Sequence, residues 1–307
     1  MGAASMSAPA MDMRTLGARG PSVSLIGFGA WPIGGGLGKV EKAQAIATVR
    51  AALEAGMTMV DTAQYYRTSE ALVGEALQGG YRERCFLATK VSFDYSAKGI
   101  REAMENSLRA LRVDQVDLYQ IHGWNPTYPI EESMEAMRRL QEEGKTRFIG
   151  VSNFLPDQME RALKVCPFSS NQVRYNLLFR EIEAGTVDFC QKHGIGIIVH
   201  SPLAKGLLTG RYRPDSTFPA DDERSGFPDF KGEPFAAHLA RAERLKQIAR
   251  DRGISLVQLA IAWTARLPVV SSVLVGAKDG TQVREHVGAS GVRLSAAELE
   301  RIERALA

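Results

Sequence analysis

The chain has 307 residues, of which 45% are hydrophobic and 24% charged, and its formal net charge at pH 7 is +3. A chain of this length can bury a large core, so the composition predicts an ordinary soluble globular protein of one or two domains. Acidic and basic residues are interspersed, which excludes the basic stripe that nucleic acid or an anionic membrane would require, and we expect neither partner. The oligomeric state leaves no signal in the sequence.

The first residues of the chain and the cysteines indicate the cellular compartment of the protein. No apolar run reaches the roughly 18 residues of a membrane-spanning helix, and residues 1–12 lack the apolar block of a signal peptide. We interpret residues 1–12 as a disordered tail or cloning remnant and residues 13–307 as one domain. Cys85, Cys166 and Cys190 are odd in number and form no CxxC pair, which indicates reduced core thiols and a cytoplasmic protein.

Short β-rich runs alternate with helical patterns along the chain. The runs end in a polar residue or glycine, and helical spacing of apolar residues lies between them, for example over 43–56, 100–113, 131–144 and 239–253. Eight such units, most of them about 30 residues long, are typical of a closed (β/α)8 TIM barrel of the α/β class. The expected strand ends are Gly29, Asp61, Lys90, His122, Ser152, Gln172, His200 and Gly276.

The last unit is much longer than the others. It contains a polar insertion marked by Pro and Gly over residues 205–235, which is too long for a passive connector and is interpreted as a lid-type loop on the active face. Near the end of the chain, Ser295 is followed three residues later by Glu298. This pattern predicts a capping box and a C-terminal helix.

The glycine-rich stretch IGFGAWPIGGGLGK invites two phosphate-loop interpretations, and both fail. A dinucleotide fingerprint starting at Gly27 would need a glycine where Pro32 stands. A P-loop ending at Lys39 would need Ser or Thr where Val40 stands. The stretch is interpreted as a turn after the first strand, either a plain flexible one or a barrel-top loop whose backbone contacts a ligand.

Three chemically useful residues end consecutive predicted strands. Asp61, Lys90 and His122 would meet at one mouth, because the carboxyl ends of barrel strands form the active face. Tyr65 and Tyr66 lie on the loop after Asp61. Taken alone, Asp61 could cap a helix and His122 could be a core histidine with backbone partners.

Together the same residues form a coherent proton-transfer site. Asp61 would hold the charge of Lys90, and that ammonium would lower the pKa of a neighbouring phenol from its usual value of about 10. His122 would donate a hydrogen bond to a carbonyl oxygen. The residues alone therefore predict a phenol that acts as a proton donor, with the choice between the two tyrosines left open.

The stretches GFGAW, DTAxxY, ATK, YQIH, GVSNF, NQVRYN, SPLxKGLLTG and VGAKxxxQ occur in this order. On these motifs the chain resembles the aldo-keto reductases from Met13 to its end. The resemblance implies a TIM barrel, a nicotinamide cofactor and a catalytic tetrad of Asp61, Tyr66, Lys90 and His122. It selects Tyr66, five positions after Asp61, and leaves Tyr65 as a neighbour in the substrate pocket, together with Trp31 and Trp124.

The resemblance also implies a set of cofactor contacts. Ser152, Asn153 and Gln172 would hold the carboxamide, and Lys278, Gln282 and Glu285 would meet the adenosine end. The complete implied set is Gly29, Ala30, Trp31, Asp61, Ser152, Asn153, Gln172, His200, Ser201, Leu203, Gly206, Leu208, Gly210, Gly276, Lys278, Gln282 and Glu285. No histidine lies at metal-ligand spacing from another or from a cysteine, so no metal site is expected.

Two departures from the family pattern bear on the cofactor. His200 stands where an aromatic residue usually stacks on the nicotinamide, and a smaller ring predicts a looser grip. Asp279 stands where Ser or Thr is common, and its charge would repel a 2′-phosphate unless Lys278 or Arg284 intervenes. We expect NADPH in preference to NADH.

The expected function is that of a reductase that moves hydride from NADPH to an aldehyde or ketone while Tyr66 protonates the oxygen. The first alternative is an NAD-dependent dehydrogenase of a sugar or alcohol, for which Asp279 is the motivation. The second alternative is a nicotinamide-binding redox sensor with little turnover, against which the intact tetrad argues.

Overall fold

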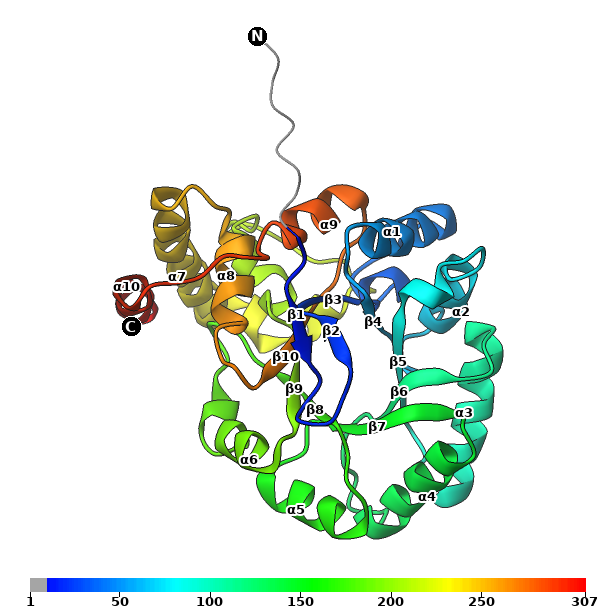
Figure 1. Ribbon diagram of the computed structural model, residues 1–307. Helices are drawn as coiled ribbons and strands as arrows, with labels where there is room; N and C mark the ends of the chain where they lie inside the picture. Colours follow the sequence, from blue (N-terminus) through cyan, green and yellow to red (C-terminus); the bar gives the residue numbers. More distant parts are fainter. Residues whose placement is uncertain (1–9) are drawn as a thin grey trace.

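The computed structural model describes residues 10–307. Eight parallel strands close into a barrel in the order β10-β3-β4-β5-β6-β7-β8-β9, and helices surround it (Figure 1). This confirms the predicted (β/α)8 TIM barrel, with strand ends within two residues of those expected from the sequence. The barrel strands are β3 (Ile26–Gly29), β4 (Met59–Asp61), β5 (Phe86–Val91), β6 (Val116–Ile121), β7 (Thr146–Ser152), β8 (Ser170–Arg174), β9 (Gly196–His200) and β10 (Val270–Val275).

The helices that cover the barrel are amphipathic and carry local start signals. In α3, for example, apolar residues recur at three- and four-residue spacing on the buried face, and Ser96 Oγ accepts a hydrogen bond from the Gly99 amide at 3.0 Å. The α-helices are α1 (Lys42–Glu54), α2 (Ser69–Ala76), α3 (Ala97–Leu111), α4 (Ile130–Glu142), α5 (Pro156–Val165), α6 (Thr186–His193), α7 (Gly232–Asp251), α8 (Leu256–Thr264), α9 (Gly280–Val287) and α10 (Ala296–Leu306).

The C-terminal helix forms as predicted. Ser295 and Glu298 make the expected capping box, with Ser295 Oγ accepting from the Glu298 amide at 3.3 Å and the Glu298 carboxylate accepting from the Ser295 amide at 2.7 Å. The helix α10 packs on α7 at the outside of the barrel (Figure 1).

A short antiparallel hairpin that the sequence did not predict covers one end of the barrel. Its strands, β1 (Met13–Thr15) and β2 (Ser22–Ser24), have only three residues each, too few to produce a readable alternation. Leu16 and Val23 are fully buried in an inner cluster with side chains from the barrel strands. The hairpin therefore seals the amino-terminal end of the barrel.

The predicted tail over residues 1–12 falls mostly on residues 1–9, which lie outside the described residues. Within the described part, the Asp12 amide donates to Ser290 Oγ at 2.8 Å, and the Asp12 carboxylate accepts from the Gly291 amide at 2.8 Å. The ordered chain thus begins before residue 13, and Asp12 fastens it to the segment that follows α9.

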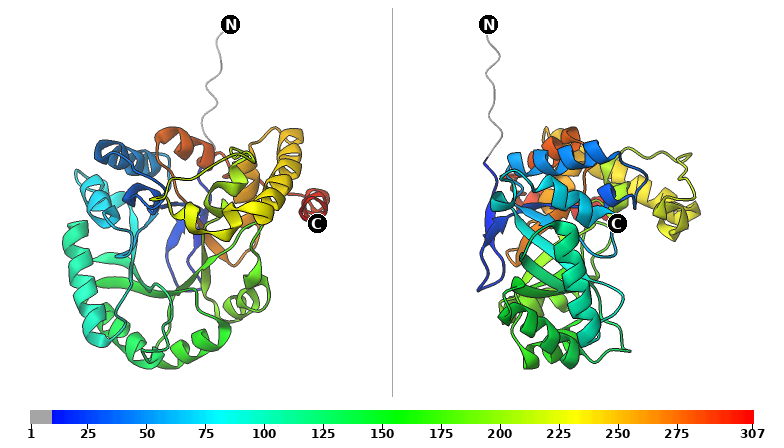
Figure 2. Two further views of the ribbon diagram at one scale, coloured as in Figure 1. Left: turned by 180° about the vertical axis from the view of Figure 1, so that it is seen from behind. Right: turned by 90° about the vertical axis from the view of Figure 1, so that its right-hand side faces the viewer.

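The long insertion lies at the opposite end of the barrel from the hairpin, as the side view in Figure 2 shows. It is built from the 3-10 helices η4 (Ala204–Thr209), η5 (Glu223–Gly226) and η6 (Pro228–Phe230). Helix α7 begins at Gly232, so the insertion ends at residue 231, and its expected end at residue 235 is wrong by four residues. Tyr212, Phe218, Phe230 and Phe235 form an aromatic cluster that anchors the segment.

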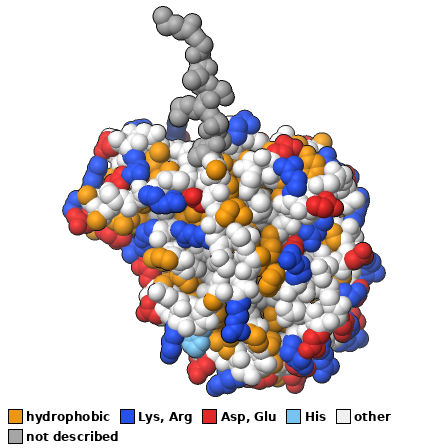
Figure 3. Space-filling view, viewed as in Figure 1, with side chains coloured by type: hydrophobic (Ala, Val, Ile, Leu, Met, Phe, Trp, Pro, Cys, Tyr) orange, Lys and Arg blue, Asp and Glu red, His pale blue; other side chains and the backbone are white. Residues whose placement is uncertain are grey.

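The charged side chains and the cysteines are distributed as the sequence indicates. On the face shown in Figure 3, basic and acidic side chains are interspersed. Within residues 10–307, no helix is both long and apolar enough to cross a membrane, and no cluster of side chains could hold a metal ion. Cys85, Cys166 and Cys190 are free and buried.

Candidate active site

A buried ion pair stands at the centre of the barrel mouth. Asp61 is the last residue of β4, and Lys90 lies near the end of the adjacent strand β5. Lys90 Nζ is 2.5 Å from Asp61 Oδ1 and donates to the Thr62 carbonyl at 2.9 Å. The side chains are only 0% and 2% exposed. Burial alone would lower the pKa of Lys90, but the neighbouring Asp61 carboxylate raises it, so the amine stays charged.

Two glutamines hold the second oxygen of the same carboxylate. Gln120 Nε2 lies 3.1 Å and Gln172 Nε2 2.9 Å from Asp61 Oδ2. The sequence interpretation missed Gln120, although it lies two residues before His122 and strand alternation places both on one face. Gln172 was expected at the cofactor carboxamide; it lines the cleft, and its amide nitrogen donates to Asp61.

The buried amine also contacts Tyr66. Lys90 Nζ lies 3.3 Å from the Tyr66 hydroxyl and 4.7 Å from the centre of its ring. Burial raises the pKa of the Tyr66 phenol above its ordinary value, and Lys90 lowers that pKa only in part. The pKa of Tyr66 is therefore raised, whereas the sequence interpretation expected the Lys90 ammonium to lower it. The difference arises because desolvation of the phenol outweighs the effect of the ammonium. Tyr66 is therefore protonated at neutral pH.

His122 directly follows β6 and completes the expected group. Its ring centre lies 5.6 Å from that of Tyr66, and its Nδ1 lies 2.8 Å from Ser92 Oγ. Burial lowers the pKa of His122 to about 3, with further lowering by the charge of Lys90 and by His200. The imidazole is neutral at physiological pH, so one ring nitrogen can donate a hydrogen bond and the other can accept one.

The four residues lie at a large cleft of about 580 Å³. Most of the residues expected at the cofactor or the substrate line it. These are Gly29, Trp31, Asp61, Tyr65, Tyr66, His122, Asn153, Gln172, His200, Ser201, Leu203, Gly206, Gly276, Lys278, Gln282 and Glu285.

Six expected residues do not line the cleft. Lys90 lies beneath it and reaches it through Tyr66, and Ser152 is buried with its hydroxyl donating to the Gln172 carbonyl at 2.8 Å. The others are supporting positions in the fold or lie beside the cleft: Ala30, Leu208, Gly210 and Trp124.

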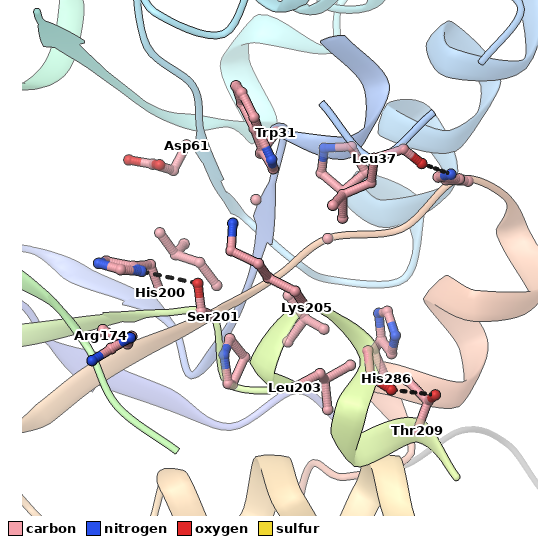
Figure 4. A pocket seen from close by; sticks show the side chains of 18 of the residues that line it. Trp31, Leu37, Asp61, Arg174, His200, Ser201, Leu203, Lys205, Thr209 and His286 are labelled. Atoms are coloured by element: carbon pink, nitrogen blue, oxygen red, sulfur yellow. Dashed lines mark hydrogen bonds between the residues drawn. The ribbon is translucent and has the colours of Figure 1, made fainter. Parts of the chain in front are cut away.

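His200 is held by hydrogen bonds at both ring nitrogens. Nδ1 lies 3.1 Å from Ser201 Oγ, the contact drawn in Figure 4, and Nε2 lies 3.1 Å from Asn153 Oδ1. Because an amide oxygen only accepts, Nε2 is the protonated nitrogen. Burial lowers the pKa of His200 to about 3, assisted by Lys90, Lys205 and Arg174. A neutral ring with a fixed plane therefore faces the cleft where the family pattern has an aromatic residue.

The loop after β9 contains several residues with left-handed backbone conformation. Ser201, Ala204 and Lys205 have φ values of 56°, 47° and 53°, and Gly206 has 104°. Loops that mix left-handed and right-handed residues are typical of anion-binding backbone, although the Ala204 and Gly206 amides here donate within the loop, to the Ser201 and Leu203 carbonyls at 2.9 Å. Such strain in three residues other than glycine is typical of a functional loop.

Cationic side chains accompany this backbone along the cleft: Lys205, Arg211, Arg224 and Lys278. Backbone amides and positive charges together suit a diphosphate, so the residues present fit a dinucleotide cofactor.

One carboxylate of the insertion joins the two sides of the cleft. Glu223 Oε1 accepts from Trp31 Nε1 at 2.9 Å and pairs with Lys205 Nζ at 2.5 Å. In Figure 4 the Lys205 side chain reaches across the cleft from η4 toward Trp31. A second tie runs from Lys278 Nζ to the Leu37 carbonyl. We call the contact of Glu223 with Trp31 and Lys205 the Glu223 latch.

Asp279 has a structural role that its position in the sequence did not reveal. It is the N-cap of α9, and its Oδ1 accepts from the amides of Thr281 and Gln282 at 2.8 and 2.9 Å. Neither Lys278 nor Arg284 pairs with it, since Arg284 Nη2 donates to Thr281 Oγ1. Helix amides, not a basic side chain, compensate its charge.

Three aromatic rings form a row at the mouth of the barrel, and two of them, Trp31 and Tyr65, line the cleft. Trp31 and Tyr65 stack with centres 5.7 Å apart and planes 8° from parallel, and Phe93 lies 5.8 Å beyond Tyr65. Tyr65 and Phe93 are 53% and 65% exposed, and Phe93 has a strained φ of 40°. Phe93 was not expected from the sequence. Trp31, Tyr65 and Phe93 are called the aromatic row below.

Comparison with known proteins agrees with this site. The model of the Aldo/keto reductase family matches residues 25–307. The chain belongs to the aldo/keto reductase family. This aldo-keto reductase is 37% identical over 287 residues to the aldo-keto reductase YhdN of Bacillus subtilis, covering 89% of this chain and 87% of that one.

Solved structures resemble this aldo-keto reductase over nearly its full length. The glycerol dehydrogenase AKR11B4 of Gluconobacter oxydans has a TM-score of 0.87 and 32% identity, covering 98% of this chain and 96% of that one. An aldo-keto reductase of Klebsiella pneumoniae in complex with NADPH has a TM-score of 0.76 and 31% identity, covering 95% and 94%. The family membership makes this protein an oxidoreductase of carbonyl compounds.

Proposed function

We propose that this protein is an NADPH-dependent reductase of aldehydes or ketones in which Tyr66 is the general acid. The observation that carries the proposal is the contact between Lys90 Nζ and the Tyr66 hydroxyl, at 3.3 Å, over a fully buried Asp61–Lys90 pair. This geometry places a protonated phenol beside a fixed positive charge at the mouth of the barrel.

The residues of the chain have separate tasks in this reaction. When bound, the nicotinamide supplies the hydride. Tyr66 transfers its proton to the carbonyl oxygen, and the Lys90 ammonium stabilises the phenolate that remains. His122, neutral at working pH, donates a hydrogen bond that orients the same oxygen. Asp61, held by Gln120 and Gln172, keeps Lys90 charged at every stage.

Three features support a dinucleotide cofactor, and the last of them supports its phosphorylated form. The wound loop around Gly206 and the nearby Lys205 and Lys278 suit a diphosphate. Arg211 lines the same cleft and is paired with Glu285 at 3.3 Å. The similar Klebsiella pneumoniae enzyme was solved in complex with NADPH.

The test is to follow NADPH absorbance during incubation with a panel of aldehydes, ketones and aldoses. We expect turnover of at least one carbonyl class by the native protein and almost none by Tyr66→Phe. A protein that binds NADPH tightly but fails to oxidise it in a single turnover with a reactive aldehyde would instead be a redox sensor.

A second candidate is the reverse reaction, oxidation of an alcohol with NAD(P)+. The observation in its favour is the likeness to a structure described as a glycerol dehydrogenase. Turnover measured in both directions with NADPH, NADH and their oxidised forms at matched concentrations decides between the two. A strong preference for NAD+ and an alcohol would overturn the first proposal.

A further inference from the structure

Ser92 stands directly behind the candidate histidine. It follows the last residue of β5 and is 4% exposed, and its hydroxyl lies 2.8 Å from His122 Nδ1. Its backbone amide donates to Gln64 Oε1 at 3.1 Å, and the His122 amide donates to the Val91 carbonyl at 3.1 Å. Both residues are thus fixed by neighbouring loops, and the contact between them is not a chance rotamer at the surface.

The direction of this hydrogen bond follows from counting hydrogens. A neutral imidazole carries one N–H, and a serine hydroxyl also carries one hydrogen. If Nδ1 carried the hydrogen and donated to Ser92, the hydroxyl hydrogen would need another acceptor. Among residues 10–307 the only partner of Ser92 Oγ is His122 Nδ1. A buried hydroxyl hydrogen without an acceptor is costly, so the serine donates and Nδ1 accepts.

We propose that Ser92 is a positioning residue that fixes His122 as the tautomer with hydrogen on Nε2. The inference rests on the proposed role of His122 as the group that orients the substrate carbonyl. With Nδ1 accepting from Ser92, Nε2 carries the hydrogen, and His122 lines the cleft. The other tautomer would present a lone pair to the carbonyl oxygen, and the two would repel each other.

The other described groups around His122 do not hydrogen-bond to its ring, which leaves Ser92 to fix the tautomer. Lys90 and His200 are the nearby groups that lower the pKa of His122, and neither makes a hydrogen bond to its ring. Tyr65 and Tyr66 approach the ring by their edges, with planes 82° and 71° from that of the imidazole. Ser92 is therefore the single hydrogen-bond partner of this ring within the described chain.

The direct test is the tautomer itself, measured without any turnover. Long-range proton–nitrogen correlation spectra of the full chain labelled with ¹⁵N-histidine distinguish protonated from unprotonated ring nitrogens, and His122→Gln assigns the signals. We expect native His122 to show an unprotonated Nδ1 and a protonated Nε2. A protonated Nδ1 in the native protein would overturn the proposal even if the variants below fail to fold.

Substitutions then test what holds the tautomer. Ser92→Ala is expected to yield mixed tautomer signals for His122, and Ser92→Thr, which keeps the hydroxyl, is expected to restore the single state. Ser201→Ala is the matched control, because it removes the corresponding hydroxyl at 3.1 Å from His200 Nδ1. It should shift the signals of His200 and leave those of His122 in place.

Kinetics supply the functional readout. Ser92→Ala should lower kcat about tenfold, the equivalent of one hydrogen bond, with the Kd for NADPH unchanged, and Ser92→Thr should recover most of the loss. Unchanged kcat with a single Nε2-protonated state in Ser92→Ala would refute the proposal. If the native protein reduces no carbonyl, the proposed function fails, and the spectra still decide the tautomer.

Discussion

The Lys90 ammonium lies between an acid and a phenol, 2.5 Å from Asp61 Oδ1 and 3.3 Å from the Tyr66 hydroxyl. Asp61 and Lys90 are buried and Tyr66 is half-buried at the cleft, so their charges act on one another with little screening by water. Burial makes the phenol a weaker acid, and the ammonium offsets part of that effect. The arrangement keeps a proton on Tyr66 until negative charge develops on a neighbouring oxygen.

Tyr66→Phe should reduce turnover by about 10²–10⁴-fold, since that is the usual contribution of positioned proton transfer. The variant removes one oxygen and keeps the ring, so the Kd for NADPH should stay close to the native value. Steady-state turnover and cofactor fluorescence titration measure the two effects. Tyr65→Phe, on the same loop, is the matched control, and near-native turnover in Tyr66→Phe would rule out the assigned role.

Lys90→Met should lower the free energy of unfolding by about 3–5 kcal/mol, because it leaves the Asp61 carboxylate buried without its partner. The double variant Asp61→Asn/Lys90→Met should regain most of this stability and remain inactive. Urea unfolding measures the change. In the control Lys98→Met, the exposed pair with Glu102 is lost, and the change should stay within about 1 kcal/mol.

The pH dependence of stability should reflect the two histidines that line the cleft, His122 and His200. Burial lowers the pKa of both His122 and His200 from 6.5 to about 3 in the folded protein. Between these values the unfolded chain binds more protons than the folded one, so stability is complete above about pH 6.5 and falls as the pH drops toward 3.

His200→Gln should therefore reduce the slope of unfolding free energy against pH by up to about 1.4 kcal/mol per pH unit in that window. Urea titrations between about pH 4 and 6.5 measure the slope. His193, exposed on α6, supplies the control variant His193→Gln. Equal slopes in the two variants would contradict the low pKa of His200.

The reduction rate should be flat from about pH 5 to 9, because His122, with a pKa of about 3, is neutral there and the raised pKa of Tyr66 keeps the phenol protonated. Above that range the rate should fall as the phenol ionises, and alcohol oxidation should rise. Single-turnover rates with NADPH and its 4-deutero form establish that hydride transfer is observed. A reduction rate that falls between about pH 6 and 8 would be inconsistent with these assignments.

Glu223→Gln should speed cofactor release by weakening the Glu223 latch. The amide keeps the shape and loses the charge that pairs with Lys205 at 2.5 Å. The side chains of this pair are 29% and 22% exposed, so we expect a rise in koff of roughly five- to tenfold, measured by stopped-flow fluorescence of NADPH. Asp221→Asn, two residues earlier and exposed, should leave koff unchanged.

Phe93→Ala should raise KM for aryl aldehydes about tenfold and leave KM for short aliphatic aldehydes nearly unchanged. The reason is the loss of the outer ring of the aromatic row, whose burial against a substrate ring is worth about 1–1.5 kcal/mol. Met13→Ala removes another exposed apolar side chain, at the sealed end of the barrel, and should change neither value. Equal changes for both substrate classes would show that the row does not select substrates.

The repeating units were predictable because short β-rich runs alternate with helical patterns at a spacing of about 30 residues, and several runs end at a residue with a distinct chemical role, as at Asp61 and His122. The family motifs then selected Tyr66 over Tyr65, a choice that the residues alone left open. The contacts that tune the site were harder to predict. Gln120 and Ser92 contribute through distances across neighbouring strands, and the Glu223 latch joins segments 192 residues apart. The pKa of Tyr66 depends on burial, which residue names do not give.

The hairpin of β1 and β2 determines from which end of the barrel small molecules reach the site. Leu16 and Val23 pack against side chains of the barrel strands and close the amino-terminal end of the barrel. Small molecules therefore cannot reach the site through this end. On the proposed function, the dinucleotide and the carbonyl compound would both enter from the carboxyl ends of the strands, where Glu223 contacts Trp31 and Lys205.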